Sequence, residues 1–258
     1  MKIAICLIAT NKYTDFFYRL EKEIFSHFLS TENVHIHLFT NKYISKKKIS
    51  KNISIHKIIH EPWPLVTLKR FQYISSIEDS LLNYDYIFYM DVDMKINSPI
   101  GNEILGSIIS TKHPGYVDSE KTEFPVCKDS NSTAYIKDTS QLKNYFAGGF
   151  FGGESKEFLK LSTTLEKNIQ TDINNKCIPI WHDESHLNFY LSETRPTKIL
   201  DEHYCFDENN LNESNHNKAK IIALSKDHSL YRYKYTKYKR AIYLPLKAVK
   251  KFLKKLFQ

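Results

Sequence analysis

The stretch Tyr84-Asp85-Tyr86-Ile87-Phe88-Tyr89-Met90-Asp91-Val92-Asp93 decides the fold class. Its first seven residues form an apolar run with the length and composition of one buried strand. The run ends abruptly in Asp91-Val92-Asp93, and ligands of open α/β sheets bind beyond the carboxyl ends of such strands. The stretch therefore predicts a strand that delivers two acids to a ligand site.

The chain on the N-terminal side of this stretch alternates strand and helix patterns. Strands are expected at 2–10, 34–39 and 53–59, and helices at 13–29 and 65–82. Apolar residues recur at helical spacing in both helices, and Pro62-Trp63-Pro64 breaks the chain before the second. Strand, helix, strand is the opening of a nucleotide-binding α/β layer.

The C-terminal side continues the α/β pattern. Residues 145–153 hold four of the seven Gly, so the backbone there must approach something closely. A helix is expected at 155–174, and the apolar stretch 177–181 leads into His182-Asp183-Glu184. Residues 112–144 are polar and turn-rich, which is typical of loops around a cleft.

Length and composition predict one α/β domain. The 258 residues, with 41% hydrophobic content, are enough to bury one large core. The apolar start at residues 1–10 is short and lacks the cleavage pattern of a signal peptide, and no run approaches the roughly 20 apolar residues of a membrane span. Four scattered cysteines argue against a zinc site and against a dense disulfide framework, so a cytoplasmic setting is expected.

The positive charge is concentrated at the C-terminus. The net charge is +8, and residues 235–258 contain eight basic and no acidic side chains, so the distribution does not favour a nucleic-acid partner. We expect a catalytic domain at 1–236 and a basic tail at 237–258. Because Leu246, Val249, Leu253 and Leu256 share one helical face, the tail is expected to bind an anionic membrane peripherally. A packing helix or a dimer contact is the alternative.

Asp91 and Asp93 offer hard oxygen ligands. Two carboxylates on the same side of an extended or turning backbone suit Mn²⁺ or Mg²⁺ and can bridge to a diphosphate. A metal there would neutralise charge on a departing nucleotide. Solvated strand ends also produce an Asp-x-Asp, so the motif by itself leaves both interpretations open.

Trp181-His182-Asp183-Glu184 places ionisable groups beside a large aromatic side chain. One interpretation is a helix N-terminus, where the helix dipole favours acids. The other is that Glu184 faces the anomeric carbon of a bound sugar, where a carboxylate stabilises or traps an oxocarbenium-like centre. Spacing alone does not separate the two.

Five blocks of the sequence occur in the same order in a known family. The blocks are Asp91-Val92-Asp93-Met94, His113-Pro114-Gly115, and residues 148–153, 181–188 and 195–198. On these motifs the chain from Lys2 to Tyr233 resembles glycosyltransferase family six, which includes the histo-blood-group A and B transferases and the α-1,3-galactosyltransferase.

The resemblance implies both a fold and a reaction. The fold would be a single-domain, nucleotide-sugar-binding glycosyltransferase fold of the A type, with a Rossmann-like mixed sheet flanked by helices. The reaction would be a retaining, metal-dependent transfer of N-acetylgalactosamine or galactose from a UDP-sugar. The new bond would be an α-1,3 linkage to a galactose-containing glycan acceptor, fucosylated or not.

The resemblance also implies roles for individual residues. Glu184 would be the catalytic carboxylate, and Asp91 and Asp93 would bind the metal, Mn²⁺ or Mg²⁺. Lys226 and Arg232 would belong to a segment that folds over the diphosphate. The positions implied for donor binding are Ala9, Thr10, Tyr13, Arg70, Asp91, Val92, Asp93, Ala147, Gly149, His182, Asp183, Lys226 and Arg232. The positions implied for acceptor binding are His113, Trp181, Glu184 and Asp207.

Departures from the family refine these expectations. The N-terminal anchor and stem of the animal members are not found, so the chain resembles the compact bacterial members. Many of those carry Asn-x-Asn and use no metal, whereas Asp91 and Asp93 are kept here, so metal dependence is expected. Around Glu123 to Val126 the alignment with the family becomes uncertain, and a hydroxyl residue that the family uses for the acceptor is not recognisable, so the acceptor is not defined. The small residues Ala147 and Gly149 favour UDP-N-acetylgalactosamine over UDP-galactose, because they leave room for the acetamido group.

Two alternatives stay open at the level of sequence. Retention can proceed through a covalent adduct on Glu184 or by attack on the same face as the leaving phosphate. A carbohydrate- or UDP-sugar-binding protein that has lost catalysis is the rival function. The joint presence of Asp91, Asp93, Glu184, Lys226 and Arg232 counts against that rival. The sequence does not indicate an oligomeric state.

Overall fold

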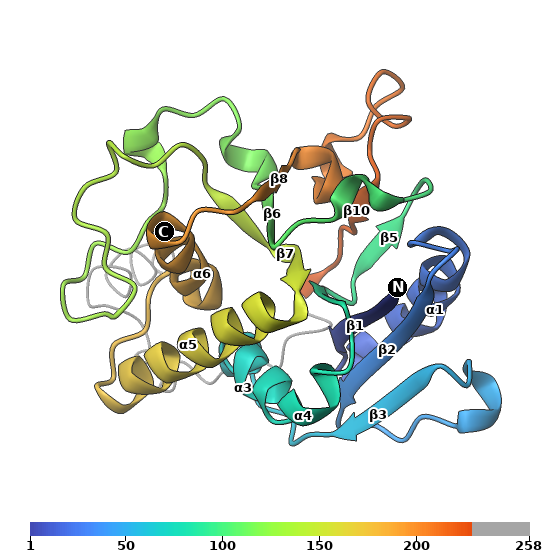
Figure 1. The fold of residues 1–258 in the computed structure, drawn as a ribbon. Helices are drawn as coiled ribbons and strands as arrows, with labels where there is room; N and C mark the ends of the chain where they lie inside the picture. The colour runs from blue at the N-terminus through green and yellow to red at the C-terminus, as the bar shows by residue number, and fades with distance from the viewer. Residues whose placement is uncertain (229–258) are drawn as a thin grey trace.

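A computed structural model describes residues 1–228, and its centre is a seven-stranded mixed sheet (Figure 1). The strand order is β3-β2-β1-β4-β7-β6-β8. β1 to β4 are parallel, and β7 runs antiparallel between β4 and β6. The strands of this sheet are β1 (Lys2–Ile8), β2 (Asn33–Thr40), β3 (Ile53–Lys57), β4 (Tyr86–Met90), β6 (Ile108–Lys112), β7 (Phe146–Glu154) and β8 (Lys198–Leu200).

Six α-helices and a second, three-stranded sheet complete the part of the chain that the structure describes. The helices are α1 (Thr14–His27), α2 (Leu65–Leu68), α3 (Arg70–Ser75), α4 (Glu78–Leu81), α5 (Ser155–Asn174) and α6 (His182–Glu193). The small sheet has the order β5-β10-β9, with β5 at Met94–Ile96, β9 at Phe206–Asp207 and β10 at Ile221–Ala223. Short 3-10 helices lie in the connections, among them η4 (Pro114–Tyr116) and η5 (Lys121–Glu123).

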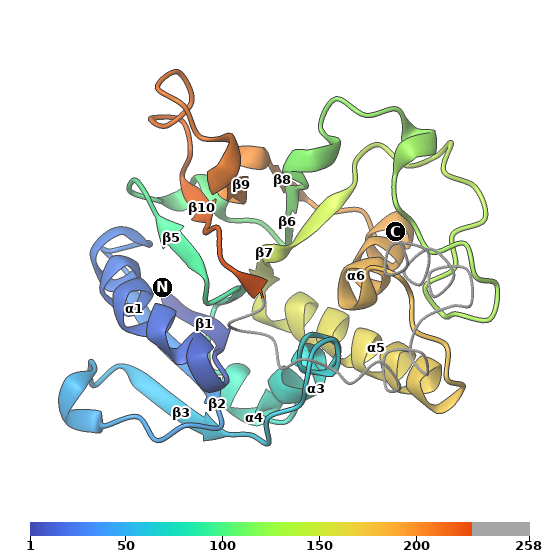
Figure 2. The same cartoon turned by 180° about the vertical axis from the view of Figure 1, so that it is seen from behind.

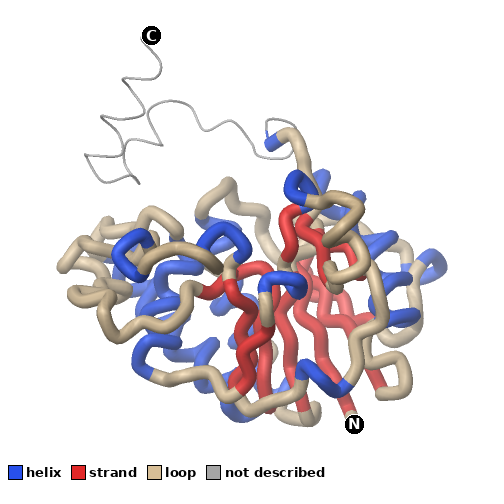
Figure 3. Tube along the Cα trace, turned by 90° about the horizontal axis from the view of Figure 1, so that it is seen from above, coloured by secondary structure: helices blue, strands red, loops and turns tan. Residues whose placement is uncertain are grey.

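The large sheet is covered on both faces. Side chains alternate along a strand, so Ile3, Ile5 and Leu7 of β1 pack in one core cluster with α1 and the small sheet. Ala4 and Cys6 pack in a second cluster with α3, α5 and α6. Figure 1 shows α3, α5 and α6 in front of the sheet, and Figure 2 shows α1 on the opposite side. From above, the strands run side by side between the two helical layers (Figure 3).

The predicted α/β architecture is confirmed, with one error in the helices. The helix expected at 155–174 is α5 with the same bounds, but the helix expected at 65–82 consists of three short pieces, α2, α3 and α4. The breaks fall at Lys69 (φ −82°, ψ 6°) and at Ile77 (φ −122°, ψ 23°), where the backbone leaves the α-helical region.

The Gly-rich stretch is a central strand with close backbone neighbours. A Cβ on Gly152 would lie 2.5 Å from Phe88, and one on Gly153 would lie 2.2 Å from the Ser107 carbonyl oxygen. Both positions therefore need glycine so that β7 can fit between β4 and β6. The close approach predicted for residues 145–153 is confirmed.

Residues 113–145, between β6 and β7, are mostly loop and are fastened to α5. The Asp172 carboxylate of α5 accepts hydrogen bonds from the Ser132 hydroxyl at 2.5 Å and from the Thr133 N–H at 2.8 Å. Asp172 is 1% exposed, so this anchor is shielded from water. We call residues 113–145 the connecting segment below.

Two expectations concern membranes. Among the described helices, none combines the length and the apolar character that crossing a bilayer requires. The basic tail expected at 237–258 lies outside the described residues, as does the donor-binding position Arg232.

Candidate active site

Asp91 is the first residue after β4, at the edge where β1, β4 and β6 end and β7 begins. Its N–H donates to the Gly149 carbonyl of β7 at 2.9 Å. The start of α6 is fixed to the same edge by Asn188, whose side chain accepts from the Phe146 N–H and donates to the Phe146 carbonyl, both at 2.8 Å. The sheet therefore brings the Asp91 and Glu184 regions together, although they are 93 positions apart in the chain.

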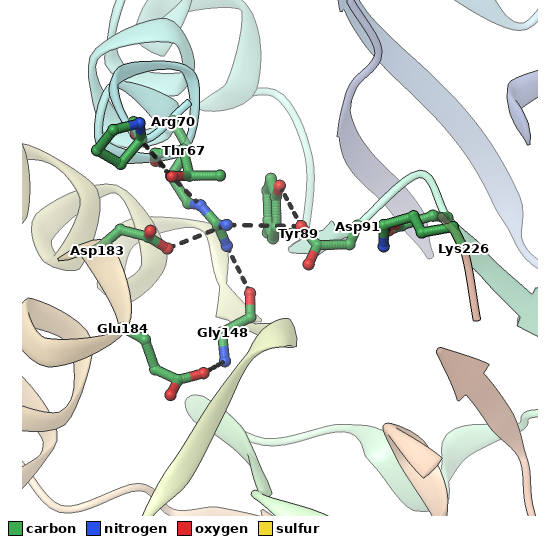
Figure 4. Close-up of polar contacts among 10 residues, drawn as sticks. Thr67, Arg70, Tyr89, Asp91, Gly148, Asp183, Glu184 and Lys226 are labelled. Atoms are coloured by element: carbon green, nitrogen blue, oxygen red, sulfur yellow. Dashed lines mark hydrogen bonds and ion pairs between the residues drawn. The ribbon is translucent and has the colours of Figure 1, made fainter. Parts of the chain in front are cut away.

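Arg70 connects the acids at this edge (Figure 4). Its guanidinium lies 3.0 Å from the Asp183 carboxylate and 3.5 Å from the Asp91 carboxylate. It also donates to the Gly148 carbonyl at 2.5 Å. Arg70 is 3% exposed; burial opposes its charge, but the surrounding acids outweigh burial and raise the pKa of Arg70. The residue is a permanent buried cation shared by several groups.

Tyr89 holds Asp91 from the other side. The Tyr89 hydroxyl donates to the Asp91 carboxylate at 2.7 Å, and the Arg70 guanidinium carbon lies 4.3 Å from the centre of the Tyr89 ring. A cation over an aromatic face is attracted by the ring, so Tyr89 orients both charged partners.

Glu184 lies in the first turn of α6, with one oxygen accepting from the Gly148 N–H at 2.8 Å. Gly148 thus donates to Glu184 and accepts from Arg70 (Figure 4). A Cβ on Gly148 would lie 3.5 to 3.6 Å from Glu184, Arg70 and Asp183, so this face of the strand contacts the group of charged side chains. The helix N-terminus and the functional interpretation of Trp181-His182-Asp183-Glu184 are compatible.

Asp183 and Glu184, which are neighbours in the chain, both have raised pKa values. Burial raises the pKa of Asp183 to about 7, and Asp91 and Glu184 add to the rise, whereas Arg70 lowers it. Burial also raises the pKa of Glu184 to about 7, although the Gly148 N–H favours the ionised form. A ligand that brings positive charge to these carboxylates would therefore be stabilised by them.

A pocket of about 150 Å³ opens beside this group of charges. It is lined by Ile8, Thr10, Tyr13, His60, Trp63, Val66, Thr67, Tyr89, Asp91, Val92, Asp93 and Lys226.

Lys226 lines this pocket and contacts the Asp93 carboxylate; Figure 4 shows Lys226 beside Asp91, on the side away from Glu184. The pocket combines aromatic walls, two carboxylates and a cation, which suits a nucleotide diphosphate with its counter-ion.

The residues at this pocket fit a divalent cation. Asp91 and Asp93 both present carboxylate oxygens to the same space, and the Lys226 ammonium at Asp93 shows that a cation is electrostatically favoured there. Within residues 1–228, no third acid, His or Cys clusters with the pair, because the one such triple is Asp201, Glu202 and His203. The remaining ligands would be diphosphate oxygens and water, as Mg²⁺-type sites commonly have.

Most donor-binding residues expected from the resemblance meet at this site. Thr10, Tyr13, Val92 and Lys226 line the pocket, and Arg70 and Asp183 form the adjoining ion pair. The buried His182 ring packs edge-on against Trp63, with ring centres 4.7 Å apart.

Ala9, Ala147 and Gly149, which were also expected to bind the donor, do not line the pocket. Ala9 is 0% exposed, and its N–H donates to the Phe39 carbonyl, so the pocket wall comes from its neighbours in the chain. Ala147 packs in the core, and the Cβ direction of Gly149 points toward Met94, Cys205 and Asp91.

The residues expected to bind the acceptor lie around Glu184. Trp181 precedes α6 and is 46% exposed. His113 caps η4 by accepting a hydrogen bond from the Gly115 N–H at 3.0 Å. Burial lowers the pKa of His113, and the nearby Asp207 carboxylate partly offsets this effect. None of Trp181, His113 and Asp207 lines the pocket that contains Thr10 and Tyr13.

Three residues at the site were not predicted as functional. Tyr89 is two positions before Asp91, and the period-two geometry of a strand was a signal that both share a face. Gly148 lies in the Gly-rich block, between Ala147 and Gly149, the two positions that the resemblance implies for donor binding. Tyr145 is 2% exposed, and its hydroxyl faces the Glu184 carboxylate; burial and the negative charge of Glu184 raise the pKa of Tyr145. No sequence pattern distinguishes Tyr145 from a core tyrosine.

Comparison with known proteins identifies the family. The profile of glycosyltransferase family 6 matches residues 1–233, which is most of the chain. The chain belongs to glycosyltransferase family 6. This family 6 chain is accordingly a glycosyltransferase that transfers a hexose from a nucleotide sugar to a glycan.

Three relatives illustrate the range of the family 6 match. The histo-blood group ABO system transferase 1 of Rattus norvegicus is 30% identical over 239 residues, covering 89% of this chain and 68% of the relative. The globoside alpha-1,3-N-acetylgalactosaminyltransferase 1 of Gallus gallus is 29% identical over 81% of this chain and 62% of its own length. The O-antigen biosynthesis glycosyltransferase WbnI of Escherichia coli is 29% identical over 88% of this chain and 96% of its own length.

Proposed function

We propose that this glycosyltransferase moves N-acetylgalactosamine, or galactose, from a UDP-sugar to a galactose-containing glycan in α-1,3 linkage, with retention of configuration. The observation that supports this most is that the pocket lined by Asp91 and Asp93 adjoins the buried group formed by Arg70, Asp183 and Glu184. The names of the animal relatives support the α-1,3 linkage and the hexosamine.

Each of these residues would have a separate role in the reaction. Tyr13 and Thr10 would hold the nucleoside end, and Lys226 the diphosphate. Arg70 and Asp183 would hold hydroxyls of the donor sugar, because their hydrogen-bonding atoms face the space above Gly148.

Glu184 would stabilise the positive charge that develops at the anomeric carbon. A divalent cation held by Asp91 and Asp93 would neutralise the growing charge on the departing UDP.

The direct test is turnover of UDP-sugars. We expect UDP release from UDP-N-acetylgalactosamine or UDP-galactose, and we expect this release to accelerate when a galactoside acceptor is added. The NMR spectrum of the product should show that the transferred sugar has the α configuration and is linked to the 3-position of the acceptor. The rival function, a binding protein without catalysis, predicts donor binding by calorimetry with no UDP release above the uncatalysed rate.

Metal dependence is expected from the two acids of the pocket. Excess chelator should abolish transfer, because the diphosphate would then meet Asp91 and Asp93 as like charges. Addition of Mn²⁺, or Mg²⁺, beyond the chelator should restore transfer. UDP release followed before and after each addition measures both effects. Full activity in excess chelator would contradict a role for the acids as metal ligands.

Donor choice is expected to depend on Gly149. We expect the wild type to prefer UDP-N-acetylgalactosamine and Gly149→Ala to shift the ratio of kcat/KM toward UDP-galactose by about tenfold. The added Cβ would lie 2.4 Å from the Met94 methyl, a flexible end that must move, and 3.5 Å from Asp91. The methyl group therefore reduces the room beside the donor site.

Gly148→Ala is the matched control for donor choice, because its Cβ lies on the other face, at ordinary contact distance from Glu184, Arg70 and Asp183. It should lower transfer from both donors alike. A wild type that prefers UDP-galactose, or an unchanged ratio in Gly149→Ala, would contradict the assignment of the donor. Membrane association of the basic tail at 237–258 remains a prediction from the sequence.

A further inference from the structure

A second hollow, of about 190 Å³, lies beside the acceptor region and is rich in lysine. Lys112 from the end of β6, Lys121 from η5 and Lys143 from the connecting segment all line it, and Glu120 is its one acid. We call these residues the lysine hollow. No residue of the first pocket takes part in it.

The charge of the lysine hollow is not neutralised by the protein. Among the ion pairs of residues 1–228, none includes Lys112, Lys121 or Lys143; Lys121 donates to the Ser140 carbonyl at 2.9 Å. Glu120 precedes η5, where its N–H donates to the Glu123 carboxylate at 3.1 Å. Three lysines therefore line one hollow together with a single acid.

This positive charge is local. Residues 1–228 contain 27 basic and 29 acidic side chains, so the described part of the protein is slightly negative as a whole. A cluster of unpaired lysines on such a background is not explained by general basicity. It also repels itself, and so it would be stabilised by an anion.

Aromatic side chains connect the lysine hollow with Glu184, because Tyr145 both lines the hollow and interacts with the Glu184 carboxylate. Tyr145 and Tyr116 line the hollow, with ring centres 5.2 Å apart, and His113 packs on Tyr116 at 5.0 Å. The buried Tyr145 hydroxyl points the other way, toward the Glu184 carboxylate. An acceptor whose reacting hydroxyl approaches Glu184 along these aromatic side chains would place its next sugar at the lysine hollow.

We propose that the lysine hollow binds an anionic group, a carboxylate or a phosphate, that the acceptor glycan carries on the residue next to the one that receives the transferred sugar. The inference rests on the proposed function and names its acceptor class. Lysine ammonium groups are compact point charges, which accept either anion without the paired geometry that arginine imposes.

The test compares three acceptors that differ in one substituent: a neutral galactosyl disaccharide, the same disaccharide with a uronic acid as the neighbouring residue, and the same disaccharide with a phosphate ester there. We expect the wild type to favour at least one anionic acceptor by about tenfold in kcat/KM, mostly through KM. The arm that is favoured identifies the carboxylate or the phosphate as the source, and equal preference for both shows that charge alone is read.

The variant K121Q/K143Q should remove that preference and leave kcat/KM for the neutral acceptor within about twofold. Both lysines are exposed, so the fold should tolerate the change. K156Q, an exposed lysine of α5 that lines neither hollow, is the matched control and should keep the preference.

UDP-sugar hydrolysis without any acceptor separates failure of the inference from failure of the proposed function. Hydrolysis that proceeds in the wild type and in the variant, together with equal use of neutral and anionic acceptors, would overturn the lysine hollow as an anion site. A preference that survives K121Q/K143Q would overturn it as well. Absence of hydrolysis and of transfer with all acceptors would instead count against the proposed function.

Discussion

Glu184→Gln is expected to lower kcat by at least about 10³-fold while UDP-sugar binding survives. The amide has the size of the carboxylate, and its oxygen can still accept the Gly148 N–H that holds Glu184 at 2.8 Å. What it lacks is negative charge, which is the property that stabilises a developing oxocarbenium-like centre or attacks it. UDP release measures kcat, and calorimetry with the UDP-sugar measures binding.

Two controls sharpen the Glu184 prediction. Glu193→Gln makes the same chemical change at the exposed end of the same helix and should leave turnover unchanged. Because burial raises the pKa of Glu184 to about 7 and the ionised form is the active one, kcat/KM of the wild type should increase as the pH rises through that region. Near-normal turnover in Glu184→Gln would remove Glu184 from the reaction.

Arg70→Met is expected to lower the free energy of unfolding by about 3–5 kcal/mol and to abolish transfer. The guanidinium is the shared partner of Asp183, Asp91 and the Gly148 carbonyl, and its removal leaves these groups without a buried cation. Urea denaturation followed by circular dichroism measures the stability, and UDP release measures transfer.

The Arg70 prediction has a conservative and a surface control. Arg70→Lys keeps the charge but not the planar fork that reaches three groups, so it should recover part of the stability and little of the transfer. Arg19→Met removes an exposed partner of Glu23 and of the Met94 carbonyl and should change the free energy of unfolding by only about 1 kcal/mol. An unfolding free energy in Arg70→Met equal to that of the wild type would contradict the role of Arg70 at the centre of the site.

The sequence predicts those parts of the fold whose pattern is local. Helix α5 has the predicted bounds because its apolar spacing is regular over 20 residues. The segment 65–82 has the same spacing, but its backbone leaves the α-helical region at Lys69 and Ile77, so three short helices form. The antiparallel place of β7 between β4 and β6 depends on partners distant in the chain, which no local pattern reveals.

The site was predictable where a motif carries it. Asp91 and Glu184 stand out in the sequence, the family resemblance adds Asp183 and Arg70, and the structure places all four in one group. That Arg70 bridges two acids and a backbone carbonyl could not be read from the sequence, because the three partners come from three elements. Tyr145 was missed for a similar reason, since only the fold directs its hydroxyl at Glu184.

The attachment of the connecting segment determines what a change within that segment would disturb. The donor groups are held by the hydrogen-bonded rungs of the central sheet, as the Asp91 to Gly149 bond at 2.9 Å shows. Residues 113–145 are instead fastened from outside, through Asp172 on α5. A change of length or sequence within residues 113–145, which include the expected acceptor position His113, would therefore leave the strand pairing that positions Asp91 and Gly149 in place.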